Sequence, residues 1–291
     1  MTHDITHAPD SVSRKVIYDL GSNNGDDIPY YLKKGDVVVA VEANPALAKQ
    51  IEQRFSQAIS EKKLFVENCV LTARGNPREV SFYLHKSNPV LSQFPKPGAA
   101  EIDQFHQVVL PATTVPDLIS TYGPPFYIKI DVEHYDEVIL GELFANNIIP
   151  PFISAESHSI QVFSLLVSQG GYKSFNLVDG ATVGTKYRNH VIQSGGRQEA
   201  FSFPHQSAGP FGEDIRERWM TEDNFFRFLA FELLGWKDIH ATTVIAPDPS
   251  YTPGLGIEDI DRAIKFVRLG SAILKRVPRP LRNLLNRLTA S

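Results

Sequence analysis

The sequence predicts an α/β fold in which a mostly parallel sheet carries helices on both faces. Short runs of β-branched residues alternate along the chain with amphipathic segments, which is the pattern of successive βαβ units. Between Asp36 and Glu42 every residue is apolar, as in a parallel strand that is buried on both faces. A chain of 291 residues, 42% of them hydrophobic, can bury a full core without disulfides or metals.

Each element is placed by its own local signal. Strands are expected where β-branched or aromatic residues cluster between turn residues, and Pro45 suits the first turn of the helix that follows the second strand. The expected strands are residues 16–20, 36–42, 64–71, 80–84, 126–131, 152–156 and 172–177. The expected helices are residues 26–34, 45–59, 114–122, 136–145 and 160–168. The strand at 80–84 alternates as in an insertion or at a sheet edge.

Other segments depart from this regular alternation. Residues 1–14 are polar and are predicted to be disordered, and residues 86–107 are predicted to be loop because they are rich in proline. Within a domain of residues 15–250, residues 181–235 mix Gly, Pro, His and aromatic residues and are predicted to form an insertion or a lid. Residues 257–291 are predicted to form a basic amphipathic C-terminal tail.

Charge is distributed unevenly along the chain. The net charge is −4, but residues 262–291 hold eight basic and no acidic residues, so the remainder carries −4 − 8 = −12. An acidic body argues against nucleic acid as the main partner. Basic residues interleaved with leucines predict peripheral contact between the tail and an anionic membrane surface. Packing of the same stripe on the protein's own body or on a second subunit is the alternative, and no oligomeric state is predicted.

The compartment is inferred from cysteine use and from the N-terminus. Cys69 is the only cysteine, so no intrachain disulfide is possible, which fits a reducing compartment. The first fifteen residues lack the apolar stretch of a signal peptide, and no apolar run approaches the roughly 20 residues that span a bilayer. We therefore expect a cytoplasmic protein, with the tail as its contact to the inner membrane face.

A nucleotide-like cofactor is predicted at the ends of the first two strands. Asp19 ends the first strand and is followed by Gly21 and Gly25, while Glu42 ends the second strand 42 − 19 = 23 residues later. In a doubly wound sheet both ends lie at the same edge, beside the topological switch point. The glycines let the backbone approach a ligand closely, and the carboxylate of Glu42 can accept both hydroxyls of a ribose.

The charges around this turn favour one cofactor over another. Dinucleotide sites use G-x-G-x-x-G with a pyrophosphate on a helix N-terminus, whereas the spacing here is G-x-x-x-G. Asp19, Asp26 and Asp27 would repel a pyrophosphate and attract the ammonium and sulfonium groups of S-adenosylmethionine. A dinucleotide, or a glycine-rich turn that only shapes the fold, are the alternatives.

Three ordered motifs resemble those of the FkbM-type methyltransferases. They are residues 19–26, 41–45 and 128–133, and the resemblance covers roughly residues 15–180. Residues 236–241 are similar to a motif near the end of some members. One departure is His134, where the family usually has glycine. The resemblance implies a Rossmann-like class I methyltransferase fold with a mostly parallel seven-stranded sheet.

The resemblance also implies the roles of individual residues and the kind of acceptor. Glu42 would hold the ribose of S-adenosylmethionine, and the acceptor would be a sugar hydroxyl in a glycan or in a small specialised metabolite. The methionine part would be held by Asp19, Gly21, Asn23 and Gly25, and the adenine side by Asn44, Asn68 and Cys69.

Catalytic residues are expected at the ends of the fourth and fifth core strands. Methyl transfer to a hydroxyl needs alignment of the acceptor and usually a base. Asp131 and Glu133 flank the end of the strand at 126–131, and His158 is a candidate general base because its ordinary pKa is near neutral. Asp131, Glu133 and His158 are therefore predicted to be catalytic. The alternatives are a turn-capping role for Asp131 and a hydrogen-bonded surface role for His158.

Two alternatives remain for this edge of the sheet: a metal site, and a protein that keeps the fold but has no catalytic activity. Asp131, Glu133, Glu156 and His158 offer ligands that suit magnesium, but no tight local spacing demands a metal, so none is predicted. The absence of G-x-S-x-G after a strand argues against a serine hydrolase. The sequence thus predicts an O-methyltransferase. The competing prediction is a non-catalytic, membrane-docked scaffold, against which the intact Asp19 and Glu42 argue.

Overall fold

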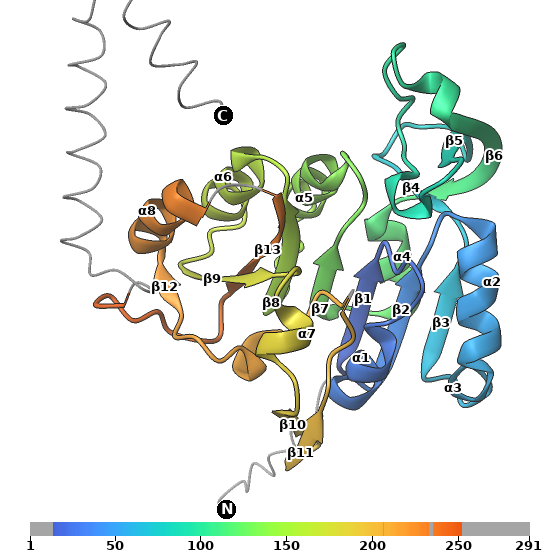
Figure 1. The fold of residues 1–291 in the computed structure, drawn as a ribbon. Coiled ribbons are helices and arrows are strands. Elements are labelled where there is room, and N and C mark those ends of the chain that lie inside the picture. Colours follow the sequence, from blue (N-terminus) through green and yellow to red (C-terminus); the bar gives the residue numbers. More distant parts are fainter. Residues whose placement is uncertain (1–13, 206, 233–234, 252–291) are drawn as a thin grey trace, which may run out of the picture.

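The chain folds around one eight-stranded sheet with the strand order β12-β9-β13-β8-β7-β1-β2-β3 (Figure 1). This computed structural model describes residues 14–205, 207–232 and 235–251. The predicted disordered N-terminus and the predicted basic tail at 257–291 lie outside the described residues, apart from Arg14. Within the described part, no helix is long and apolar enough to cross a membrane.

Five neighbouring strands of the sheet run parallel. They are β1 (Val16–Leu20), β2 (Val37–Val41), β3 (Leu64–Glu67), β7 (Pro125–Ile130) and β8 (Phe152–Ser157). β13 (Gly235–Thr242) is antiparallel and lies between β8 and β9 (Ser174–Asp179). The predicted α/β fold with a mostly parallel sheet is confirmed. The expected count of seven strands is exceeded by β12 (Met220–Thr221), a two-residue edge strand that pairs with β9.

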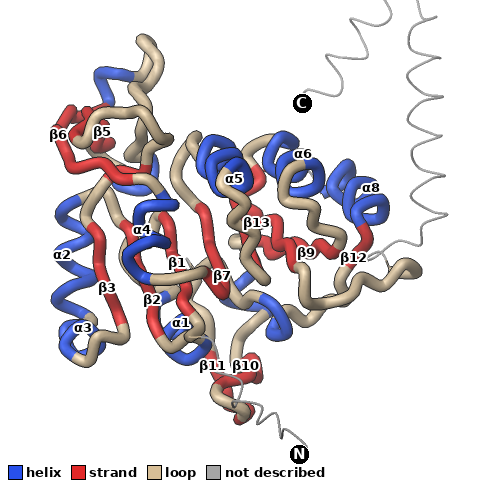
Figure 2. The backbone as a smooth tube through the Cα atoms, turned by 180° about the vertical axis from the view of Figure 1, so that it is seen from behind, coloured by secondary structure: helices blue, strands red, loops and turns tan. Residues whose placement is uncertain are grey.

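Helices cover both faces of the sheet because side chains alternate between the two faces of each strand. Ile17 of β1 belongs to one buried cluster and Tyr18 to the other. The Tyr18 face is covered by α4 (Val115–Tyr122), α5 (Asp136–Ala145), α6 (Ile160–Ser168) and α8 (Glu222–Glu232). The Ile17 face is covered by α1 (Ile28–Lys34), α2 (Pro45–Arg54) with the short α3 (Ser56–Ser60), and α7 (Val183–Lys186). Figure 2 shows α4 in front of β1 and β2, on the side opposite α1.

A small second sheet lies beside α2 and β3 (Figure 1). It is formed by β4 (Val70–Leu71), β5 (Glu79–His85) and β6 (Phe105–Thr113) in the order β4-β6-β5, with short 3₁₀ turns at Pro89–Leu91 and Ile102–Gln104. The strand expected at 80–84 is confirmed as part of an insertion. Strand β6 was missed, because Pro111 within it argues against a strand, and the sheet tolerates this proline since it lies near the end of β6.

The segment predicted as an insertion or lid packs on the Ile17 face of the sheet. Its hairpin, β10 (His190–Ser194) and β11 (Arg197–Phe201), adjoins α1. Phe211 stacks on Tyr127 of β7 with ring centroids 3.9 Å apart, and Tyr30 of α1 donates a hydrogen bond to Asp214 at 2.7 Å. This segment therefore completes the hydrophobic core on that face. The end of the predicted insertion forms α8 on the other face.

Candidate functional site

The carboxyl ends of β1, β2 and β7 open into a cavity with an empty volume of about 740 Å³, including its open mouth. Four of the predicted cofactor residues line it, as do two predicted catalytic ones. These are Gly21, Asn23, Glu42, Cys69, Asp131 and Glu133. The cavity therefore lies at the edge of the sheet where the sequence predicts the cofactor.

Two glycines shape the turn after β1 for different reasons. Gly21 has φ +87°, and a Cβ there would lie 1.8 Å from the backbone oxygen of Asp131, so only glycine lets this turn lie against the end of β7. Gly25 does not line the cavity. A Cβ at Gly25 would meet Ile28 and Ile51 at 3.0 and 3.1 Å, so it allows α1 and α2 to pack closely.

Glu42 is fixed at the cavity wall by two backbone donors. The amides of Asn23 and Asn44 each donate to one of its carboxylate oxygens at 2.7 Å. Burial raises the pKa of this carboxyl to about 7, although both hydrogen bonds favour the ionised form. Each oxygen keeps a second lone pair, so Glu42 can accept two hydroxyls of a bound ribose.

The predicted adenine-side residues divide into one lining residue and two that shape the loop. Cys69 is buried and lines the cavity, and burial raises the pKa of its thiol to about 12. Asn44 caps α2 by accepting from the Ala46 amide at 3.0 Å. Asn68 donates to the carbonyls of Glu42 and Ala43 at 2.8 and 3.0 Å. Neither asparagine lines the cavity.

The sequence did not predict the apolar side chains of the cavity. They come from α2, β4, β5 and the loop after β5, and they include Leu47, Val70, Phe82, Val90 and Phe94. They suit a flat aromatic ring such as adenine. No local signal marked them, because the small second sheet brings them to the cavity from distant parts of the chain.

Asp19 lies behind the cavity wall and faces a buried lysine. It is 1% exposed, and its carboxylate lies 3.7 Å from the Lys129 ammonium. Lys129 also lies 3.1 Å from the Asp131 carboxylate and donates to the Gly21 carbonyl at 3.3 Å. Burial lowers the pKa of Lys129, but the carboxylates of Asp131 and Asp19 raise it more, so the lysine stays charged. Asp19 therefore acts on the site through Lys129. Lys129 was not singled out from the sequence. A lysine inside an otherwise apolar strand is the signal that could have identified it.

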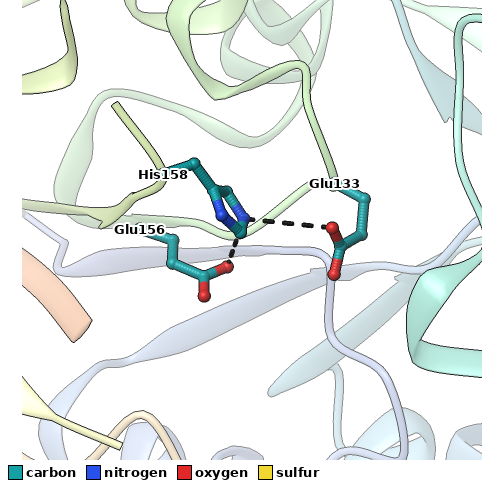
Figure 3. Close-up of side chains that lie close together, drawn as sticks. All are labelled: Glu133, Glu156 and His158. Atoms are coloured by element: carbon teal, nitrogen blue, oxygen red, sulfur yellow. Dashed lines mark ion pairs between the residues drawn. The ribbon is translucent and has the colours of Figure 1, made fainter. Parts of the chain in front are cut away.

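Three titratable side chains meet next to the cavity (Figure 3). The His158 ring nitrogen Nε2 lies 2.8 Å from the Glu156 carboxylate and 3.9 Å from that of Glu133. Possible metal-binding atoms of the three side chains all lie within 4.8 Å of one another. This cluster can share a proton or hold a divalent cation.

The cluster raises the pKa of each of its three members. The hydrogen bond to Glu156 raises the pKa of His158 to about 9, so the ring is mostly protonated at neutral pH. Burial and the nearby Glu156 carboxylate raise the pKa of Glu133 to about 7. Glu133 is therefore the member that accepts a proton most readily near pH 7.

His134 occupies the place where glycine was expected. Its φ is +63°, a left-handed conformation that glycine adopts freely and that costs a histidine some strain. Its ring centroid lies 5.8 Å from that of His158. The turn therefore keeps the backbone path of a glycine while adding an imidazole near the cluster.

Comparisons with individual known proteins give only distant similarities. No functionally curated protein matches the chain. Among solved structures, the chain is similar to a precorrin-6y C5,15-methyltransferase from Geobacter metallireducens GS-15, at 10% identity and a TM-score of 0.35, covering 78% of each chain. It is also similar to an O-methyltransferase from Bacillus cereus, at 9% identity and a TM-score of 0.34, covering 79% of this chain and 74% of the other. Both similarities are too low to carry an argument.

The family model is more informative. The model of the methyltransferase FkbM domain matches residues 19–170, just over half of the chain. This range contains the glycine turn, Glu42 and all three members of the Glu133–Glu156–His158 cluster. The predicted family is confirmed: the chain belongs to the FkbM methyltransferase family.

Proposed function

We propose that the protein transfers the methyl group of S-adenosylmethionine to a sugar hydroxyl. The observation that carries this proposal is that Glu42 and Glu133 line one cavity, with Glu156 and His158 beside Glu133. A ribose-binding carboxylate and a proton acceptor at one cavity are what methyl transfer to a hydroxyl requires.

The residues of the cavity fit the cofactor. Its adenine would lie among the apolar side chains from α2 and the small sheet, and its ribose hydroxyls would donate to Glu42. Gly21 lets the backbone approach the cofactor's sulfur closely, and the acidic surroundings favour its positive charge. When bound, S-adenosylmethionine supplies an electrophilic methyl group.

The acceptor hydroxyl would be activated by Glu133. As the acceptor oxygen bonds to the methyl carbon, the carbon–sulfur bond breaks and its electron pair stays on sulfur. The hydroxyl proton passes to the Glu133 carboxylate. The ion pair of Glu156 with protonated His158 holds Glu133 in a partly ionised state, since His158 favours its charged form while Glu156 opposes it. In this proposal His158 positions the base.

A sugar fits the acceptor side by its chemistry. Carboxylates that are not fully paired accept hydroxyl donors, and an exposed aromatic face stacks on the apolar face of a pyranose ring. Trp236, at the start of β13, is 47% exposed and lies at the same edge of the sheet as the cluster, since Gly235 pairs with Ser157. The family resemblance gives the same acceptor class.

The test is calorimetry with S-adenosylhomocysteine followed by methyl transfer to a panel of mono- and oligosaccharides, with products identified by mass. We expect binding, and a mass increase of one methyl group on at least one sugar. Binding without transfer to any sugar would contradict the acceptor class. Absence of binding, with tight binding of NADH instead, would contradict the methyltransferase proposal itself.

The membrane contact predicted for residues 260–288 also stays a proposal. It rests on their basic and leucine-rich pattern, which would suit an enzyme acting on lipid-linked glycans. Co-sedimentation of the full chain with anionic vesicles, compared with a chain ending at Glu258, tests it. Equal sedimentation of the two would contradict it.

A further inference from the structure

A second, more polar pocket adjoins the cofactor cavity. Its empty volume is about 440 Å³, including open solvent, and it shares Asn23 and Asp131 with the first cavity. Its other lining residues are Ser22, Asn24, Asp26, Asp27, Lys129, Gly180, Ala208, Trp236 and Asp238. The last four lie outside residues 19–170, so this pocket combines the family's cofactor turn with later parts of this chain.

Asp238 has a carboxylate without a partner in this pocket. Asp238 is 7% exposed, and within the described residues no hydrogen bond or ion pair reaches its carboxylate, although its backbone belongs to the β13 ladders. The other acids of the lining are paired. Asp26 pairs with Arg54 at 2.9 Å, Asp131 pairs with Lys129 at 3.1 Å, and Asp27 accepts from the Ala208 amide at 3.1 Å and from Ser207.

The surroundings of Asp238 are negative. It lies directly across the β13–β8 ladder from Glu156, and like charges at such positions repel. Lys129 is the only cation among the lining residues, and Asp19 and Asp131 already neutralise it. Burial, then Asp131, raises the pKa of Asp238 well above its usual range. Such a carboxylate needs a positively charged donor to become favourable.

We propose that this pocket binds an ammonium group and that Asp238 accepts its hydrogen bond. The inference rests on the proposed function, because the methionine end of the cofactor carries such a group. A ligand whose ribose lies at Glu42 would pass Gly21 and reach the second pocket along Asn23 and Asp131, which line both. An amino group on the acceptor is the other source of the same chemistry.

Trp236 closes this pocket on one side. A Cβ at Gly180 would lie 2.6 Å from the indole ring, so a larger residue there would clash with the ring. The Gly180 amide also donates to the Trp236 carbonyl at 3.2 Å. An indole face next to an ammonium group adds a cation–π attraction and excludes water. This role on the pocket side is compatible with the exposed part of the ring contacting a sugar.

The experiment compares two ligands that differ only at the amino-acid end. S-adenosylhomocysteine carries the ammonium, and 5′-methylthioadenosine keeps the adenosine and sulfur without it. In Asp238→Asn, calorimetry should give a dissociation constant for S-adenosylhomocysteine about 10- to 150-fold higher and an unchanged one for 5′-methylthioadenosine. Asp103→Asn, which makes the same change at an exposed acid outside both pockets, is the matched control and should leave both constants unchanged.

The remaining outcomes separate the two sources of the ammonium group. If Asp238→Asn binds S-adenosylhomocysteine normally but, once saturated with it, no longer binds glucosamine while glucose binding is unaffected, the acceptor supplies the amino group. Unchanged binding of S-adenosylhomocysteine and of glucosamine would overturn the proposal. If the wild type binds neither adenosine ligand, the proposed function fails, and the comparison of glucosamine with glucose, repeated without S-adenosylhomocysteine, still decides this inference. Trp236→Leu, which should weaken the same ligand about 2- to 30-fold, provides a second variant if Asp238→Asn does not fold.

Discussion

The proposed cofactor side of the site is held mainly by backbone, whereas the proposed acceptor side is held by charged side chains. Glu42 is fixed by two amides, and Gly21 lies against the backbone of Asp131. Glu133, in contrast, has only the 3.9 Å ion pair with His158 among the described residues. The side chains on the proposed acceptor side therefore have few partners within the protein, and we expect a bound substrate to supply the missing ones.

The largest expected effect tests the acceptor side alone. Glu133→Gln removes the proposed base and keeps its shape, so turnover should fall roughly 10²- to 10⁴-fold. The affinity for S-adenosylhomocysteine, measured by calorimetry, should not change. Glu101→Gln, an exposed acid outside the cavity, is the control. Wild-type turnover in Glu133→Gln would show that Glu133 is not the base.

The next effect tests the cofactor side. Glu42→Gln loses the charged acceptor of the ribose hydroxyls, so the dissociation constant for S-adenosylhomocysteine should rise about 10- to 150-fold. Turnover at saturating S-adenosylmethionine should stay near that of the wild type, because Glu42 is not proposed to take part in proton transfer. Normal affinity of Glu42→Gln for S-adenosylhomocysteine together with low turnover would contradict the division of roles between the two sides.

The pH dependence of turnover sharpens the same comparison. The base must be ionised, and the pKa of Glu133 is about 7, so kcat should rise with pH up to about 7 and then level off. Below pH 7 the change approaches tenfold per pH unit. Above about pH 9, where His158 loses its proton, a further change in rate is expected. In Glu133→Gln the rise of kcat towards pH 7 should be absent. If the variant keeps this rise, a group other than Glu133 causes it.

The smallest effect concerns stability. The folded-state pKa of Glu42, about 7, lies above its ordinary value of 4.5, so folding favours its protonated form. Its contribution to the free energy of unfolding is fully present below pH 4.5 and is lost as pH rises through 7. Glu42→Gln should therefore show a smaller decrease in the free energy of unfolding between pH 4.5 and 7, measured by urea titration. An identical pH slope in the two proteins would contradict this assignment.

The position of the glycine turn and Glu42 at one edge of the sheet was predictable because the signals for it are local. A buried strand, a glycine turn and an acid at the next strand end are contiguous in sequence, and the structure places Gly21, Asn23 and Glu42 in one cavity. The roles of the neighbouring residues were less predictable. Gly25 and Asn44 belong to the same motifs, but they serve helix packing and helix capping, and sequence alone does not separate such roles from ligand contact.

The acceptor side was predictable only in part, because tertiary structure assembles it. Glu133, Glu156 and His158 were recognised from their places at strand ends, but the distances that set their protonation depend on how β7 and β8 align. Asp238 lies on β13, which enters the sheet antiparallel between β8 and β9 from the far end of the chain. Residues 236–241 resemble a family motif, but nothing in the irregular sequence around them predicted that they would enter the sheet between β8 and β9.

The position of Cys69 makes the adenine side of the cavity observable without any engineered label. It is the only cysteine in the chain, it lines the cavity, and it is 6% exposed. Because a thiol with a pKa of about 12 reacts slowly while buried, the rate of its alkylation should report how often the adenine side opens to reagent. Intact-protein mass spectrometry over time would then follow the opening of this part of the cavity in the unmodified sequence.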